Sequence, residues 1–262
     1  MTNQPDLADT AAKADALRAL HAGPKMLVLP NAWDAASARI VEAAGFPVIA
    51  TTSAGVAVAL GYEDHQKAPM VEMLAAAKRI IQAVSIPVTV DFEAGYGLSP
   101  REVAERMIEI GAAGLNYEDT DHAGASPMVD PNQQSERIVA LKDAARTAGA
   151  DLVVNARVDV FVHRQGTLQE QAAEGLRRAQ QYKAAGADCI YPILLSDEAI
   201  IREFVEAVGP INVNLRPGGA LTLAQVAALG VRRVSYASSL FREMNSALER
   251  VTADLHSQTD AL

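Results

Sequence analysis

A unit of two elements recurs along this chain of 262 residues: a helical segment stops at a glycine, and an apolar segment follows within a few residues. Glycine commonly ends helices because it enters the left-handed conformation without a Cβ clash. The apolar segments carry almost no charge, as is typical of parallel strands that are buried on both faces. We therefore expect strands at 26–29, 47–51, 87–91, 113–118, 152–157, 188–193, 211–215 and 233–237.

Strands that alternate with helices in this number predict an α/β fold of the (β/α)8 TIM-barrel type, which closes in roughly 250 residues. A doubly wound open sheet is the alternative, but no Gly-x-Gly-x-x-Gly follows an early strand. No linker-like segment divides the chain, so we expect residues 1–262 to form a single barrel domain, with residues 1–10 disordered. The segment 240–255 has the pattern of an amphipathic helix.

Composition excludes several classes of function. Half of the residues are hydrophobic, and the net charge of −9 is the opposite of a nucleic-acid-binding surface. A single cysteine, Cys189, excludes a disulfide framework. No apolar run reaches the roughly 18 residues of a membrane span, and the N-terminus lacks the pattern of a signal peptide. We expect a soluble cytoplasmic protein with neither nucleic acid nor membrane as a partner.

Two carboxylates, Asp91 and Glu93, follow the third expected strand. Side chains at i and i+2 of an extended segment point to the same side, where two acids repel each other unless a cation lies between them. Oxygen ligands at this spacing suit Mg²⁺ or Mn²⁺. The alternative interpretation is a solvated junction between a strand and a loop.

Other polar residues also follow the strands, where barrels carry their catalytic groups. A divalent cation near Asp91, Glu93 and Glu118 would compensate the excess of acids, and Arg157 has the geometry to bind a substrate carboxylate bidentately. The segment 119–131 lacks a clear helix or strand, so we expect a lid there. Its His122 either reaches the site or is a solvated loop histidine.

Four short segments carry a combined pattern: 60–64 reads LGYED, 91–97 reads DFEAGYG, 116–119 reads NYED and 155–157 reads NAR. In this order the chain resembles the isocitrate lyase/phosphoenolpyruvate mutase superfamily, over about residues 27–241. The resemblance implies a barrel whose C-terminal helix is exchanged between subunits of a homotetramer or dimer.

The resemblance also implies roles for individual residues. It implies Mg²⁺, with Mn²⁺ as the alternative, held by Asp91, Glu93 and Glu118. It gives Asp64 and Arg157 catalytic roles, and His122 is a further candidate catalytic residue because it lies in the expected lid. The substrate-binding residues that it implies are Thr52, Ser53, Ala54 and Arg157. Asn214 is added because it follows the seventh expected strand, at the same end of the barrel.

The activity implied by the resemblance is cleavage of a C–C bond in a small 2-oxo or hydroxy-carboxylic acid through an enolate that Mg²⁺ stabilises. The lid lacks the cysteine of isocitrate and methylisocitrate lyases, and also the lysine and asparagine of the phosphonate-processing branch. We expect a Mg²⁺-dependent carbon–carbon lyase, resembling oxaloacetate decarboxylase or the methylisocitrate and isocitrate lyases. Decarboxylation of a 2-oxo diacid such as oxaloacetate ranks first, because a departing CO₂ needs no general acid from the lid. The alternatives are C–P chemistry of the phosphoenolpyruvate mutase or phosphonopyruvate hydrolase type, and a catalytically silent protein that binds 2-oxo acids.

Overall fold

A closed ring of parallel strands forms the centre of the computed structural model, which describes residues 6–122, 124 and 126–259. One sheet runs in chain order through β2 (Asn31–Ala32), β3 (Ile49–Thr51), β4 (Val88–Asp91), β5 (Gly114–Glu118), β6 (Val153–Val158) and β7 (Cys189–Pro192). The other pairs β1 (Leu27–Leu29) with β9 (Arg233–Ser235), and β9 with β8 (Asn212–Asn214).

Two connections close this ring. The chain passes from β1 into β2 across Pro30, which has no N–H to donate to a ladder. A parallel bridge between Ile190 and Ile211 joins β7 to the residue before β8. The predicted (β/α)8 barrel is therefore confirmed, and every expected strand is present.

Helices follow the strands and cover the outside of the barrel. The layer between strands and helices holds the main hydrophobic core, which includes Ile80, Met107 and Ile138. The covering helices are α2 (Ala35–Ala43), α3 (Ser53–Leu60), α4 (Met70–Gln82), α5 (Pro100–Ile110), α6 (Pro131–Thr147), α7 (Val160–His163), α8 (Leu168–Ala184), α9 (Glu198–Val208) and α10 (Leu223–Ala228).

Helix α1 (Leu7–Ala22) closes the amino-terminal end of the barrel. Its Leu17 packs against interior residues at the start of the strands, among them Leu27 and Val153. The expected disorder of residues 1–10 is wrong for residues 7–10, because Asp6 caps the helix by accepting a hydrogen bond from the N–H of Ala8. Residues 1–5 lie outside the described residues.

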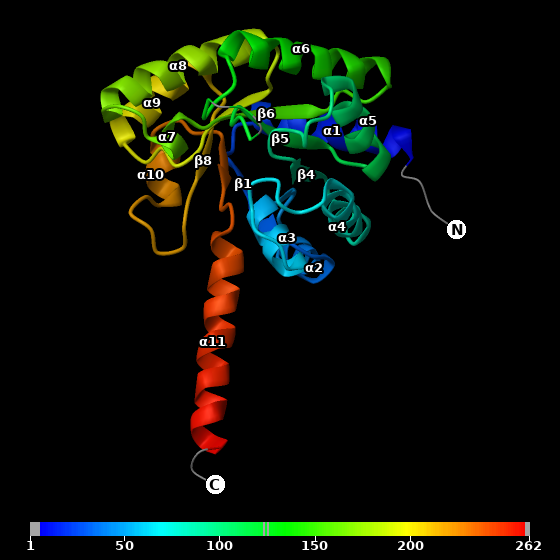
Figure 1. Ribbon diagram of the computed structural model, residues 1–262, viewed down its shortest axis with the longest axis vertical. Helices are drawn as coiled ribbons and strands as arrows, with labels where there is room; N and C mark the ends of the chain where they lie inside the picture. The colour runs from blue at the N-terminus through cyan, green and yellow to red at the C-terminus, as the bar shows by residue number, and fades with distance from the viewer. Residues whose placement is uncertain (1–5, 123, 125, 260–262) are drawn as a thin grey trace.

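Helix α11 (Ser239–Thr259) projects away from the barrel (Figure 1). Its start is anchored where Phe241 packs edge-on against Trp33, with ring centroids 5.3 Å apart. Beyond this anchor the helix is largely exposed. Within the described ranges, no helix is both long and apolar enough to cross a membrane.

A buried ion cluster joins α1 to the barrel. Asp188 accepts hydrogen bonds from Arg18 Nε at 3.0 Å, from Lys142 Nζ at 2.9 Å and from the N–H of Val154 at 2.8 Å. Lys142 is 2% exposed and also pairs with Asp151 at 2.7 Å. Burial alone would raise the pKa of Asp188, but Lys142 and the hydrogen bonds outweigh it and lower that pKa.

The Asp188→Asn variant is expected to lose about 3 kcal/mol of unfolding free energy, because it leaves part of a buried charge uncompensated. In the wild type this contribution is present above the ordinary pKa of an aspartate and is lost as pH falls through the lowered pKa of Asp188. Urea unfolding at neutral and acidic pH measures both effects. The control is Asp15→Asn, which removes an exposed partner of Arg18 and should cost under about 1 kcal/mol. Equal losses in the two variants would contradict the assignment.

Candidate active site

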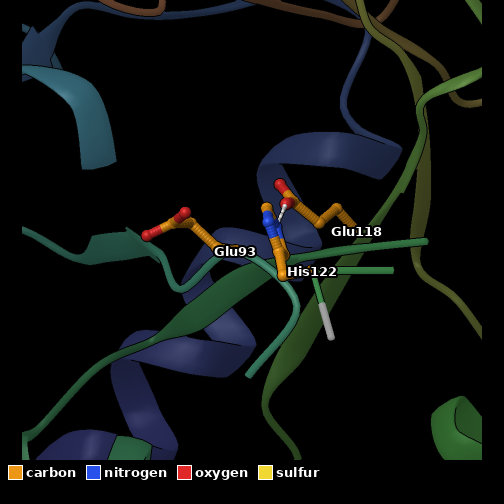
Figure 2. Close-up of side chains that lie close together, drawn as sticks. All are labelled: Glu93, Glu118 and His122. Carbon is orange, nitrogen blue, oxygen red and sulfur yellow. Dashed lines mark hydrogen bonds and ion pairs between the residues drawn. The ribbon is translucent and has the colours of Figure 1, made fainter. Parts of the chain in front are cut away.

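Two carboxylates and one imidazole converge at the carboxyl end of the barrel (Figure 2). Glu118 is the last residue of β5, Glu93 lies two residues beyond β4, and His122 lies four residues after Glu118. One potential ligand atom from each lies within 4.8 Å of the other two. His122 Nε2 is 2.6 Å from Glu118 Oε1. Ligand atoms this close together can be bridged by one metal ion.

A tight turn, not strand alternation, places Glu93. Glu93 and Tyr96 have φ angles of 49° and 53°, in the left-handed region that non-glycine residues rarely adopt. Gly95 and Gly97 also have positive φ, which accounts for the glycines of the 91–97 motif. The expectation that Asp91 and Glu93 share one side of an extended segment therefore has the wrong geometric basis, because the chain turns between them.

Burial is the main cause of the raised pKa values of the two carboxylates in the cluster, Glu93 and Glu118. Glu93 accepts a hydrogen bond from Tyr96 Oη at 2.5 Å and one from the N–H of Gln66 at 2.8 Å. Burial nevertheless raises the pKa of Glu93 to about 8, and the charges of Glu118 and Asp91 add to the rise. Burial also raises the pKa of Glu118 well above its usual range, although Arg157 opposes the shift. A divalent cation would favour the ionised form of both groups.

Asp64 also fits the interpretation that this cluster is suited to a divalent cation. Its Oδ1 is buried without a hydrogen-bond partner among the described residues. Its charge contributes to the raised pKa values of Glu93 and Glu118, after burial as the main cause. The donor set is therefore rich in carboxylate oxygen, which suits a divalent cation.

Asp91 lies beside this cluster and is held by hydrogen bonds. Its Oδ2 accepts from the N–H of Ser53 at 3.1 Å and from Ser53 Oγ at 2.9 Å. Its Oδ1 accepts from Asn116 Nδ2 at 3.2 Å, and Asn116 Oδ1 accepts from Asn155 Nδ2 at 2.8 Å. Asp91 is not among the described residues that meet within 4.8 Å, so its role as a metal ligand stays a prediction.

Arg157 joins the cluster through its charge. Its Nη1 lies 2.6 Å from Glu118 Oε2, while Nε and Nη2 donate to the two oxygens of Asp159 at 2.7 and 2.8 Å. Burial alone would raise the pKa of Asp159, but Arg157 reverses this and lowers it. These contacts leave N–H groups of the five-donor guanidinium for a substrate anion.

Sequence reasoning missed the hydrogen bonds that hold Asp159, the partner of Arg157, in place. Asp119 Oδ1 accepts from the N–H of Asp159 at 2.9 Å, and Asp119 Oδ2 accepts from Arg178 at 2.9 Å and from Tyr182 at 2.7 Å. Arg178 and Tyr182 lie on α8, far from any motif, and only their spacing of four residues hinted at a shared face.

The predicted substrate-binding residues separate into two places. Ser53 lies against Asp91, and Thr52 caps α3 by accepting a hydrogen bond from the N–H of Gly55 at 3.4 Å. Ala54 follows in the first turn of α3. Asn214 instead accepts from the N–H of Leu194 at 2.9 Å and lines a separate cavity of about 240 Å³.

The segment 119–131, predicted as a lid, is described by the structure only in part. The stem of the segment 119–131 is paired, since Thr120 and Met128 form an antiparallel bridge and Val129 N–H donates to Asp119 O at 2.9 Å. Residues 123 and 125 lie outside the described residues. His122 belongs to the described part and points into the cluster (Figure 2).

Comparisons with known proteins find relatives in both sequence and fold. A family model described as phosphoenolpyruvate phosphomutase matches residues 17–256. The 2-methylisocitrate lyase of Escherichia coli (strain K12) is 32% identical over 254 residues, which cover 90% of this chain and 82% of that enzyme. A putative phosphonomutase from Burkholderia cenocepacia J2315 has a TM-score of 0.85 and 37% identity, covering 92% of this chain and 99% of that one. A phosphoenolpyruvate phosphomutase from Streptomyces platensis subsp. rosaceus has a TM-score of 0.82 and 26% identity, covering 94% and 88%.

The raised pKa of Glu93 predicts how the stability of the metal-free protein depends on pH. The folded chain holds this proton until about pH 8, whereas the unfolded chain releases it near 4.5, so stability falls as pH rises between these values. Glu93→Gln should reduce the fall of Tm with rising pH and should raise Tm near pH 8. Thermal unfolding in the presence of a chelator measures both effects. As a control, Glu105→Gln on the exposed side of α5 should leave this pH dependence of Tm unchanged. A wild-type Tm that does not vary across this interval would contradict the prediction.

Proposed function

The chain belongs to the phosphoenolpyruvate phosphomutase family, within the isocitrate lyase/phosphoenolpyruvate mutase superfamily, and we propose that it is a Mg²⁺- or Mn²⁺-dependent lyase. Its substrate is a small 2-oxo or hydroxy-carboxylic acid whose C–C bond is cleaved. The observation that carries this proposal is the convergence of Glu93, Glu118 and His122 beside Arg157. The superfamily assignment made from the sequence motifs is confirmed.

The residues present fit such a cation. Glu93 and Glu118 would hold it, with Asp64 and Asp91 close enough to act electrostatically on both. When bound, the cation supplies positive charge that stabilises negative charge developing on a substrate oxygen.

The protein groups divide the remaining tasks. Arg157 presents its unused N–H groups to a substrate carboxylate, while Asp159 holds the guanidinium in place through two hydrogen bonds. Ser53 orients Asp91 at the start of α3, where the helix dipole favours an anion. Burial of Glu118 keeps water from weakening these interactions.

Among specific reactions, decarboxylation of a 2-oxo diacid such as oxaloacetate ranks first. The chain has one cysteine, Cys189, and it is buried in β7, so the lid supplies no thiol acid. A departing CO₂ needs no proton from a general acid. The similarity to 2-methylisocitrate lyase supports C–C cleavage as the class of reaction.

The second candidate is C–P chemistry on a phosphonate, which the similarity to a putative phosphonomutase favours. Phosphorus NMR of phosphonopyruvate incubated with the protein separates the two. A new phosphorus signal supports C–P chemistry, and an unchanged one after long incubation excludes it. A third candidate, a binding protein without turnover, would be stabilised by 2-oxo acids and convert none of them.

Glu118→Gln is expected to lower kcat/KM by at least about a thousandfold on whichever acid the wild type cleaves, because it removes both a metal ligand and the partner of Arg157. Proton NMR of a panel of 2-oxo and hydroxy acids with Mg²⁺ identifies that substrate and measures the loss. The control is Glu109→Gln, an exposed residue on α5 that pairs with Arg106. Unchanged turnover by Glu118→Gln, or by the wild type after chelation, would sink the proposal.

We also propose that α11 packs against other copies of this chain in a homo-oligomer. Met244, Leu248, Val251 and Leu255 are 44–59% exposed and recur at spacings of four, three and four residues, which lines one face of a helix. Exposed apolar side chains in a continuous stripe are typical of an interface. An exchange of this helix between subunits would cover the stripe.

Leu248→Glu is expected to shift the protein to a smaller assembly, because it places a charge in the centre of the apolar stripe of α11. Ala253→Glu places the same charge on the opposite side of the helix and should leave the assembly unchanged. Light scattering coupled to size-exclusion chromatography measures the mass of each. A monomeric wild type, or an equal shift in both variants, would refute the proposal.

A further inference from the structure

We infer that His122 is a direct nitrogen ligand of the metal centre, and that it makes this site select Mn²⁺ or Co²⁺ over Mg²⁺. The inference rests on the proposed function and adds to it the identity of a ligand and the preference for a class of ion.

The first support is the position of Nε2. One atom each from Glu93, Glu118 and His122 lie within 4.8 Å of one another. An ion with ligands at roughly 2.0–2.2 Å spans donors up to about 4.4 Å apart, so a shift of a few tenths of an ångström brings all three into coordination. Figure 2 shows the imidazole of His122 and the carboxylate of Glu118 pointing toward each other, with Nε2 and Oε1 2.6 Å apart.

The second support is that His122 is held in place. It follows Thr120, which forms an antiparallel bridge with Met128, and Asp121 N–H donates to Pro127 O at 3.1 Å. Glu118 itself is buried at the end of β5, four residues before the histidine. The imidazole is 16% exposed, so it is largely inside the cluster and not in solvent.

The third support is the chemistry of the donor set. Mg²⁺ prefers oxygen ligands and retains several of its waters. Carboxylates suit both Mg²⁺ and Mn²⁺, whereas imidazole suits first-row transition ions, whose affinity for a given site rises from Mn²⁺ to Co²⁺ along the Irving–Williams order. Adding one imidazole to two carboxylates therefore favours Mn²⁺ and Co²⁺ over Mg²⁺, whereas carboxylates alone would accept Mg²⁺ and Mn²⁺ alike.

The neighbouring His65 provides a matched control. Its ring centroid lies 6.2 Å from that of His122, but its side chain is exposed and it is outside the group of converging ligands. Its φ of 65° is in the left-handed region, which asparagine tolerates well. Asparagine therefore suits position 65, and the same substitution at position 122 gives a side chain too short to reach the ion.

The experiment is pulsed electron paramagnetic resonance of Mn²⁺ bound to protein carrying ¹⁵N-labelled histidine. We expect ¹⁵N coupling to the ion in the wild type and in His65→Asn, and its loss in His122→Asn. Isothermal titration of the chelator-treated proteins should show Mn²⁺ and Co²⁺ binding to the wild type at least about tenfold more tightly than Mg²⁺. His122→Asn should lose at least about tenfold in affinity for Mn²⁺ and Co²⁺, with little change for Mg²⁺.

The possible failures are distinguishable. Bound Mn²⁺ without ¹⁵N coupling in the wild type overturns the ligand assignment and leaves the proposed lyase intact. A wild type that binds no divalent cation overturns the proposed function as well. The wild-type spectrum needs no substitution, so the test stands even if His122→Asn fails to fold, which circular dichroism reports.

Discussion

The accumulation of buried carboxylates at one end of the barrel is the constraint on which the rest of the site depends. Glu93, Glu118 and Asp159 are all 3% exposed or less. Charges that lose their water are costly unless partners compensate them, and their mutual repulsion adds to the cost. The elevated pKa values of Glu93 and Glu118 show that protein groups alone compensate them incompletely. A bound cation would complete the compensation, so the repulsion between these carboxylates would favour its binding.

Hydrogen-bond networks hold the acids in position around that constraint. Ser53 and Asn116 fix both oxygens of Asp91, and Asn155 continues the network to the next strand. Arg157 bridges Glu118 and Asp159, so one guanidinium orients two carboxylates. Such a network limits how far any one ligand can move, which is the condition for precise placement of a substrate.

The amino-terminal end of the barrel carries stabilising contacts, whereas the carboxyl end carries the candidate site. At the amino-terminal end, α1 packs Leu17 into the interior, and Asp188 ties Arg18 to Lys142 with each charge paired. At the carboxyl end, acids outnumber bases and turns with positive φ place Glu93. Strain and unpaired charge are tolerated at this end because the rest of the barrel supplies the stability.

The sequence by itself determined the barrel, its strands and the superfamily, because burial on both faces, glycine helix ends and the 91–97 motif are local signals. It also placed Glu93, Glu118 and Arg157 together at the carboxyl ends of the strands. Only the tertiary structure decided that His122 joins Glu93 and Glu118 while Asp91 stays with Ser53. Those distances depend on a left-handed turn and on the pairing of the lid stem. Contacts between strands distant in sequence leave no periodic pattern along the chain, so sequence reasoning could not supply them.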